Sequence, residues 1–203
     1  MRVLLLGATG RTGRRVRHRL AAGGHEVVTY GRRPGGGARE MVGPVDDADG
    51  LRAALDGVDA IASCLASSNA DPVCSTATRT LIAAADRPLR YVLVSGSTVA
   101  AAGDVPGWRD RAAAGVMRIF MGGMLADREA EMALLADAPL RWTALRPPRL
   151  TDRPGRGAWR FDLDRVRGTA LSRDDLAGAV VEALARGDLT GRAPFISTAP
   201  AAA

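Results

Sequence analysis

The sequence predicts an α/β fold, a doubly wound parallel sheet with helices on both of its faces, in a single domain. Two observations predict it. Apolar segments of strand length alternate with segments of helical periodicity along most of the 203 residues, which favours parallel strands joined by helices. The first apolar run, at 2–6, also passes directly into a glycine-rich turn that opens a helix, an arrangement typical of the Rossmann type of this fold.

Each element follows from a local signal. Short apolar runs between Gly, Pro, Ser or Asn indicate strands, and apolar residues spaced at i and i+4 indicate helices. Gly23 and Gly24 end the first helix, and Ser172 caps the last one. In order, we expect strand 2–6, helix 11–22, strand 26–30, a loop at 34–38, a short strand at 39–42, helix 49–55, strand 58–65, helix 72–85, strand 90–94, a loop to about residue 108, a helix at 109–136 bent near Gly122 and Gly123, strand 140–145, a loop at 151–160, helix 173–186 and a short strand at 195–197.

The glycine-rich turn has the spacing that a dinucleotide requires. Gly7 lets the chain turn sharply, Gly10 lets the backbone approach a pyrophosphate, and Gly13 lets the helix pack close to the strand. The N–H groups at the start of the helix then face the phosphates.

Arg32 and Arg33 follow the second strand, where a protein that prefers NAD usually has an acidic residue. A guanidinium can hold a 2′-phosphate through two parallel hydrogen bonds. The two arginines therefore predict NADP(H) as the cofactor rather than NAD(H). A glycine-rich surface turn followed by solvated arginines is the alternative explanation of the same residues.

Composition limits the partners. The formal net charge is +6, but the chain has no lysine and its arginines are spread without a recognition motif, so we expect no nucleic-acid partner. Cys64 and Cys74 lack the spacing of metal ligands, so we expect no metal site. No apolar run is long enough to cross a membrane, and the N-terminus does not resemble a secretory signal. We therefore expect a cytoplasmic protein, monomer or homodimer, that binds a small-molecule substrate and no membrane.

Five segments carry a resemblance to one family: 6–13 (LGATGRTG), 57–61 (GVDAI), 93–96 (LVSG), 141–150 (RWTALRPPRL) and 172–177 (SRDDLA). Together they are similar to the atypical short-chain dehydrogenases/reductases, in particular the small NAD(P)H-binding proteins of the flavin reductase/biliverdin reductase B and NmrA-like groups. The resemblance covers nearly the whole chain. It implies one NAD(P)-binding Rossmann domain over residues 1–203, with 147–171 and the C-terminal part forming a cap on the substrate side.

The resemblance also implies roles by position. Thr9 to Gly13 would hold the phosphates, and the backbone near Val45 and Asp46 would lie by the adenine. The segments after the fourth and fifth strands would follow the nicotinamide half of the cofactor. The implied cofactor-binding residues are Gly7, Thr9, Gly10, Arg11, Thr12, Gly13, Arg32, Arg33, Val45, Asp46, Cys64, Leu65, Ala66, Ser95, Gly96, Pro147 and Pro148.

One departure from the family decides the expected chemistry. The main branch of short-chain dehydrogenases donates a proton from a Tyr-x-x-x-Lys pair, whereas this chain has no lysine and only Tyr30 and Tyr91, both at strands. A flavin, quinone or tetrapyrrole can take its proton from water, so we expect an NADPH-dependent reductase for such a flat, conjugated acceptor. Ser97 and Arg149 are the candidates for polarising an acceptor oxygen. Alternatively, Ser97 bonds the backbone in a turn and Arg149 is a surface cation or the partner of an aspartate.

The long helix carries an apolar strip formed by Met117, Phe120, Met121 and Met124, for which core or lid packing is the favoured explanation. Alternatively, the flat acceptor lies against this strip. On the same helix, Asp127, Glu129 and Glu131 either include a general base or are solvated or paired with Arg128. Two other functions stay open, a non-catalytic NADP(H)-sensing regulator of the NmrA-like type and a non-redox isomerase or cyclase. The candidate substrate-binding residues are Thr98, Phe120, Met121, Met124 and Leu150.

Overall fold

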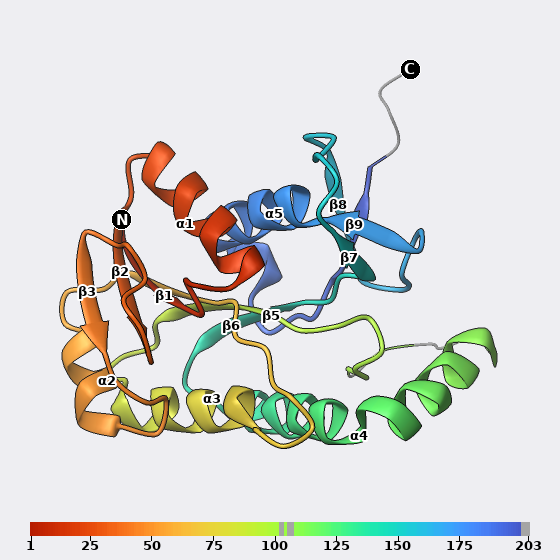
Figure 1. Ribbon diagram of the computed structural model, residues 1–203, viewed down its shortest axis with the longest axis horizontal. Helices are drawn as coiled ribbons and strands as arrows, with labels where there is room; N and C mark the ends of the chain where they lie inside the picture. Colours follow the sequence, from red (N-terminus) through yellow and green to blue (C-terminus); the bar gives the residue numbers. More distant parts are fainter. Residues whose placement is uncertain (102–103, 105–107, 200–203) are drawn as a thin grey trace.

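The structure is a computed structural model that describes residues 1–101, 104 and 108–199, without the side chains of 108–114, 116, 117 and 119. At its centre is a six-stranded sheet in the order β3-β2-β1-β4-β5-β6, in which every neighbouring pair is parallel (Figure 1). The predicted doubly wound sheet is therefore confirmed. Its strands are β1 (Arg2–Leu6), β2 (Glu26–Gly31), β3 (Arg39–Val42), β4 (Ala60–Ser63), β5 (Arg90–Val94) and β6 (Arg141–Leu145).

Helices cover both faces of this sheet, as expected (Figure 1). A layer of two helices lies on one face and a layer of three on the other, and a short 3₁₀ helix, η1, follows the last helix. None of the described helices combines the length and the apolar character needed to cross a membrane. The first layer is α1 (Arg11–Ala22) and α5 (Arg173–Ala185), the second is α2 (Ala48–Ala54), α3 (Val73–Ala84) and α4 (Trp108–Ala136), and η1 is Gly187–Leu189.

Strand β1 contributes to both hydrophobic cores. Val3 and Leu5 pack in the core beneath α1 and α5, whereas Leu4 and Leu6 pack in the core beneath the other three helices. Successive side chains of a strand point to opposite faces, so a strand in the middle of the sheet must be apolar at every position. This explains the uninterrupted apolar run at 3–6.

The order in which strands are added to the sheet reverses at the boundary between β1 and β4. From β1 the chain adds β2 and β3 on one side, and it then crosses over to add β4, β5 and β6 on the other side. β1 pairs with β2 on one side and with β4 on the other. The loop after β1 leads to α1 on one face, and the loop after β4 leads to α3 on the opposite face. The two loops therefore diverge at the carboxyl ends of the strands, which is where sheets of this kind bind ligands.

Four short strands beyond β6 form two small sheets that the sequence did not fully predict. β8 pairs with β10 in antiparallel fashion, and β7 pairs with β9 in parallel. A loop was expected at 151–160, but one strand ends at Thr151 and another begins at Trp159. Runs of three or four residues are too short to show a periodicity. The strands are β7 (Arg149–Thr151), β8 (Trp159–Asp162), β9 (Ala170–Ser172) and β10 (Phe195–Thr198).

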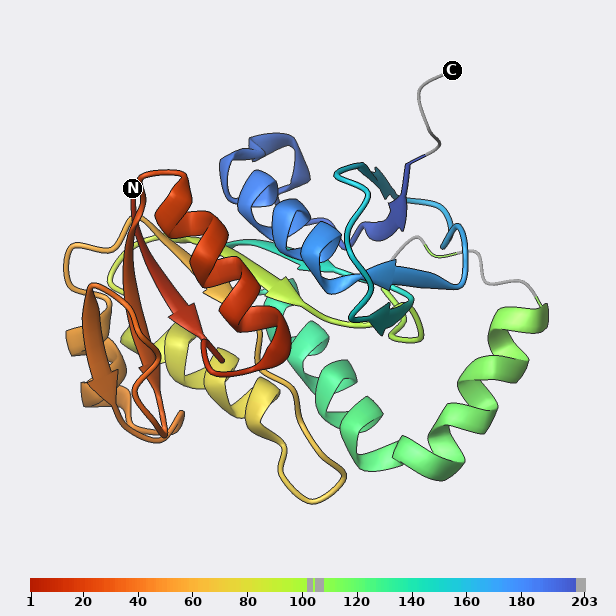
Figure 2. The ribbon, with the colours of Figure 1, turned by 45° about the horizontal axis from the view of Figure 1, so that its top comes forward.

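Helix α4 bends at Met121, next to the predicted Gly122–Gly123 position, where the backbone leaves the helical region (φ −133°, ψ 32°). The Asn69 side chain enters the bend, donating to the carbonyl oxygen of Phe120 at 3.0 Å and accepting from the N–H of Met124 at 3.3 Å. An inserted polar side chain of this kind satisfies the backbone groups that a bend exposes. The first part of α4 consequently projects away from the body of the molecule (Figure 2).

Candidate functional site

Two cavities lie at the carboxyl ends of the parallel strands and share two lining residues, Leu65 and Ala66, just after β4. The β2-side cavity, of about 340 Å³, is lined by segments that follow β1, β2, β3 and β4 and by the start of α3. The β5-side cavity, of about 300 Å³, is lined by the start of α1, the segments after β4 and β5, and residues of α4, β7 and α5. The two cavities adjoin at these residues, on either side of the switch between β1 and β4, and we refer to them together as the crevice.

The glycine-rich turn forms the floor of this crevice. Gly7 has φ +74°, a conformation that favours glycine, and a Cβ there would lie 2.7 Å from the carbonyl carbon of Cys64. A Cβ on Gly13 would overlap the carbonyl oxygen of Gly7, so α1 packs directly on the turn. Gly10 precedes α1 and offers no side-chain acceptor to the first N–H groups of the helix. Those N–H groups, at the positive end of the helix dipole, are available to an anion.

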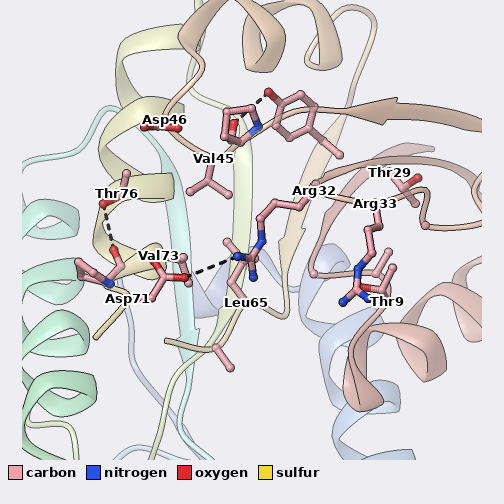
Figure 3. Close-up of a pocket in the computed structure, with 18 residues that line it drawn as sticks. Thr9, Thr29, Arg32, Arg33, Val45, Asp46, Leu65, Asp71, Val73 and Thr76 are labelled. Atoms are coloured by element: carbon pink, nitrogen blue, oxygen red, sulfur yellow. Dashed lines mark hydrogen bonds and ion pairs between the residues drawn. The ribbon is translucent and has the colours of Figure 1, made fainter. Parts of the chain in front are cut away.

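Two arginines form the wall of the β2-side cavity at the end of β2. Arg32 extends into the cavity, and Arg33 lies beside Thr9 (Figure 3). Nη1 of Arg32 is 3.8 Å from Oδ2 of Asp71 on the opposite wall. The two side chains are 77% and 51% exposed, so their ion pair contributes little to stability. The guanidinium of Arg32 can therefore leave Asp71 and turn toward a ligand at small energetic cost.

Tyr30 holds the loop that closes the β2-side cavity. Its hydroxyl donates to the carbonyl oxygen of Pro44 at 3.0 Å and lies 3.3 Å from Oδ2 of Asp47. Burial, reinforced by the charge of Asp47, raises the pKa of Tyr30 to about 12. This tyrosine thus stays protonated at neutral pH and positions Val45 and Asp46 along the cavity.

Arg128 of α4 reaches the β5-side cavity from a buried position, with its side chain only 10% exposed. Its Nη2 donates to the carbonyl oxygen of Leu65 at 2.6 Å, and its Nη1 pairs with Glu131 at 2.6 Å. Burial lowers the pKa of the Arg128 guanidinium, but the negative charge of the adjacent Glu131 raises it, and the net shift is upward. Arg128 is therefore a fixed positive charge in the wall of the cavity.

A chain of buried polar groups continues from Glu131 into the core. Glu131 accepts a hydrogen bond from Thr78 at 3.0 Å, and the Thr78 hydroxyl is 2.9 Å from that of Tyr91. Burial raises the pKa of Tyr91, and it raises the pKa of the Cys64 thiol to about 12. Neither group ionises near neutral pH, so the cavity has no reactive thiolate or tyrosinate.

Asp127 is neither solvated nor paired with its neighbouring arginine, contrary to expectation. It is 4% exposed and accepts from the N–H groups of Cys74 (3.0 Å) and Ser75 (3.1 Å) and from the hydroxyls of Ser67 and Ser75. Burial raises the pKa of Asp127, but these hydrogen bonds outweigh it, so the net shift is downward. Pro72 supplies no side-chain cap to α3, so Asp127 caps that helix from α4.

Three arginines converge on one carboxylate beside the start of α1. Asp152 lies 3.1 Å from Arg11, 3.4 Å from Arg15 and 3.1 Å from Arg173. Arg11 and Arg173 also line the β5-side cavity, and within the described part of the chain no aspartate or glutamate lines it. The cavity therefore combines an apolar wall with a positive rim.

Most predicted cofactor-binding residues lie along the crevice, while Gly13 supports the turn from behind. The β2-side cavity is lined by Gly7, Thr9, Arg32, Arg33, Val45, Asp46, Leu65 and Ala66. The β5-side cavity is lined by Gly10, Arg11, Thr12, Cys64, Leu65, Ala66, Ser95 and Gly96, together with the predicted substrate residues Thr98, Met124 and Leu150.

The remaining predicted residues line neither cavity. The N–H of Ser97 donates to the carbonyl oxygen of Pro147 at 3.0 Å, which fits the alternative of a turn residue, and Pro147 and Pro148 are buried. Arg149 precedes Leu150 on β7, and because strand neighbours point to opposite faces, Leu150 lines the crevice and Arg149 does not. The structure thus gives no geometric support to Ser97 or Arg149 as a polarising group.

Phe120 and Met121 are also outside the crevice, with 73% and 36% of their surface exposed. The bend at Met121 directs the preceding part of α4 away from the cavity, whereas Met124, beyond the bend, stays in its wall. The predicted apolar strip is therefore divided by the bend.

Sequence reasoning missed several residues that the structure brings to the crevice. Among them, Val99, Arg128 and Arg173 line the β5-side cavity, and Asp71 lines the β2-side cavity. Arg128 and Arg173 are single charges on helices, and a single charge is normally solvated. Only knowledge of which helix face meets the sheet distinguishes them from surface arginines.

Comparison with known proteins agrees with this geometry. A family model described as NAD(P)H-binding matches residues 7–186, and no curated protein sequence matches significantly. Similar solved structures include a short-chain dehydrogenase/reductase from Veillonella parvula DSM 2008 in complex with NADP (TM-score 0.78, 16% identity, covering 98% of this chain and 95% of that chain). Another is ChuY, an anaerobillin reductase from Escherichia coli O157:H7 (TM-score 0.78, 20% identity, covering 99% of this chain and 100% of that chain). A third is a protein from Lactobacillus casei (TM-score 0.82, 18% identity, covering 98% of this chain and 100% of that chain). At these identities the likeness shows the fold.

Proposed function

The chain belongs to the NAD(P)H-binding family, and on that basis we propose that it is an NADPH-dependent reductase that transfers hydride to a small, flat, conjugated acceptor such as a flavin, a quinone or a tetrapyrrole. The two adjoining cavities of the crevice carry this proposal. The crevice runs from two arginines at the end of β2, over the glycine turn, to an apolar cavity behind β5. A dinucleotide seated along it has its diphosphate at the start of α1 and its two ends in the two cavities.

The phosphate preference is supported by the end of β2. That strand ends at Gly31 and is followed directly by Arg32 and Arg33, at the position where a protein that prefers NAD usually has an acidic residue. Both arginines line the β2-side cavity. A 2′-phosphate there gains charge-assisted hydrogen bonds that NADH cannot form.

The acceptor class is supported by the chemistry of the β5-side cavity. Leu125, Leu150 and Met124 supply apolar surface for a flat ring, and Arg128 supplies a fixed cation. A bound NADPH provides the hydride. Arg128 would stabilise negative charge that develops on an acceptor oxygen, because its guanidinium is preorganised by Leu65 and Glu131. The proton then comes from water, since no described residue of the cavity wall is a free acid.

A non-catalytic NADP(H) sensor is the second candidate, and one observation favours it. Tyr30 lines the opposite end of the crevice and Tyr91 lies behind the β5-side cavity, so no tyrosine reaches the acceptor position. A sensor predicts similar affinity for oxidised and reduced cofactor and no turnover.

The test is a calorimetric titration with NADPH, NADH and NADP⁺, followed by an acceptor screen that records NADPH oxidation by absorbance. Arg32→Ala and Arg33→Ala should each weaken NADPH by about tenfold and leave NADH nearly unchanged. Arg79→Ala, an exposed arginine outside both cavities, is the matched control. Equal losses for both cofactors contradict the phosphate assignment, and binding without turnover on any conjugated acceptor favours the sensor.

A further inference from the structure

A third cavity, of about 330 Å³, lies on the other side of β7 from the crevice and shares no lining residue with it. The alternation along β7 creates this arrangement, because Leu150 faces the crevice while both of its neighbours face the third cavity. Its wall is rich in guanidinium and hydroxyl groups, contributed by Arg149, Arg153, Arg156, Thr151, Thr169 and Thr198.

The three guanidinium groups of this cavity are paired with no described acid, although the buried carboxylate of Asp175 also lines it. Among the residues that the structure describes, no ion pair or side-chain hydrogen bond involves Arg149, Arg153 or Arg156. The nearby acids are all engaged elsewhere. Asp152 pairs with three arginines on the crevice side, and Asp174 pairs with one of those at 2.9 Å.

The third nearby acid, Asp175, fixes the loop that carries two of these arginines. It is 2% exposed, and its two oxygens accept from the N–H groups of Arg156 (3.0 Å) and Gly157 (2.9 Å). The loop passes so close to α5 that a Cβ on Gly155 would lie 2.6 Å from Asp175. The carboxylate of Asp175 thus accepts hydrogen bonds from the backbone rather than pairing with a guanidinium. These bonds hold the loop in place before any ligand binds. Such preorganisation lowers the cost of binding.

We propose that this cavity binds a small, multiply charged oxyanion at a site separate from the dinucleotide crevice. Like charges gathered without a partner repel one another, and an anion placed among them relieves that repulsion. Guanidinium forks and hydroxyls are the donors that phosphate and carboxylate groups require. The described lining residues include no aromatic side chain on which a base could stack, so the ligand is a compact phosphate or polycarboxylate rather than a nucleotide.

The test is calorimetry on protein saturated with NADP⁺, which fills the crevice, at fixed ionic strength. Inorganic pyrophosphate is the phosphate probe and citrate is the carboxylate probe. We expect one saturable site, and the probe that binds more tightly identifies the chemistry of the ligand. In Arg153→Gln/Arg156→Gln the affinity should fall by at least about tenfold. Both side chains are exposed, so the variant should fold normally.

The matched control is Arg79→Gln/Arg192→Gln, which removes the same charge from two exposed arginines outside all three cavities. An equal loss of affinity in this control would mean that the probe responds to net charge alone, and would overturn the proposal. The absence of saturable binding to either probe would overturn it as well. Arg149→Gln provides a second, independent variant from β7. The same comparison can be made on protein without NADP⁺, so failure of cofactor binding leaves the test intact.

Discussion

Arg32 and Asp71 face each other across the β2-side cavity, with Nη1 and Oδ2 3.8 Å apart (Figure 3). The arginine comes from the end of β2 and the aspartate from the segment before α3, so the pair joins the two walls that an adenosine 2′-phosphate would lie between. A bound phosphate must share Arg32 with this carboxylate and also lie near its negative charge. On the proposed assignment, Asp71 therefore opposes the preference for a 2′-phosphate that the two arginines would create.

Removing that carboxylate should sharpen cofactor selection. In Asp71→Asn we expect NADPH to bind about two- to fivefold more tightly, which is the effect of an exposed charge pair, with little change for NADH. Calorimetry with both cofactors measures the ratio. Asp86→Asn, an exposed aspartate outside the crevice, controls for the change in net charge. A gain for NADH as large as that for NADPH would show that Asp71 does not act on the phosphate.

The contact between Gly13 and Gly7 should be indispensable for the diphosphate site. A methyl group at position 13 meets the carbonyl oxygen of Gly7, which is backbone and cannot rotate away. We expect Gly13→Ala to cost about 1–3 kcal/mol of stability and to weaken NADPH and NADH equally, since both carry the diphosphate. Thermal unfolding and calorimetry measure the two effects. Gly122→Ala, where a methyl group meets no atom within 4 Å, should lower neither the stability nor the cofactor affinity.

The cap that Asp127 places on α3 should make a large and pH-dependent contribution to stability. Asp127→Ala leaves buried donors of Ser67, Ser75 and Cys74 without an acceptor, and we expect a loss of about 3 kcal/mol in urea unfolding at neutral pH. The matched control is Glu129→Ala on the same helix, whose exposed ion pair should cost less than about 1 kcal/mol.

The pH dependence of Asp127 follows from the direction of its shift. The pKa of Asp127 in the folded state lies below the ordinary value of 3.8, so its contribution is complete above that pH and is lost as the pH falls through the folded-state pKa. The stability curves of the wild type and Asp127→Ala should therefore converge in strong acid. Curves that stay parallel down to that range would contradict a charged cap.

The sequence predicted the parts of the site that local chemistry determines. The turn from Gly7 to Gly13 requires glycine for its backbone geometry, and Arg32 and Arg33 follow a strand whose end is easily located. Leu150 and Met124, predicted as substrate-binding residues, line the β5-side cavity, because their elements end or bend beside it. These signals lie within a few residues of the feature they predict.

The rest depends on contacts between distant segments. Arg149 was predicted to lie in the site beside Leu150 because the strand β7 was not predicted. Without that strand, the sequence does not show that these two side chains point to opposite faces. Asp127 caps a helix that starts 54 positions earlier, at Val73, and its sequence neighbours give no sign of this. Arg128 resembles a solvated helix residue until α4 is packed against the loop after β4. Such roles arise from tertiary packing, which a single sequence does not display.

Arg128 should contribute to hydride transfer more than to cofactor binding. Removing it alone would leave Glu131 buried without a partner, at a cost of about 3–5 kcal/mol, and would confuse instability with lost activity. The informative variant is Arg128→Met/Glu131→Gln, which removes both charges and keeps an acceptor for Thr78. Against a conjugated acceptor we expect kcat to fall by about 100-fold, the usual effect of losing one preorganised donor.

Arg118→Met/Glu129→Gln is the control for Arg128, since it removes an exposed ion pair from the same helix, 2.5 Å between its charged atoms. Its kcat should match the wild type. The affinity for NADPH, measured by calorimetry, should change little in either double variant, because the proposed 2′-phosphate contacts are in the β2-side cavity, which Arg128 does not line. A loss of kcat with unchanged cofactor affinity separates stabilisation of the reacting acceptor from simple binding. Wild-type kcat in Arg128→Met/Glu131→Gln would mean that the acceptor oxygen develops its charge away from this guanidinium.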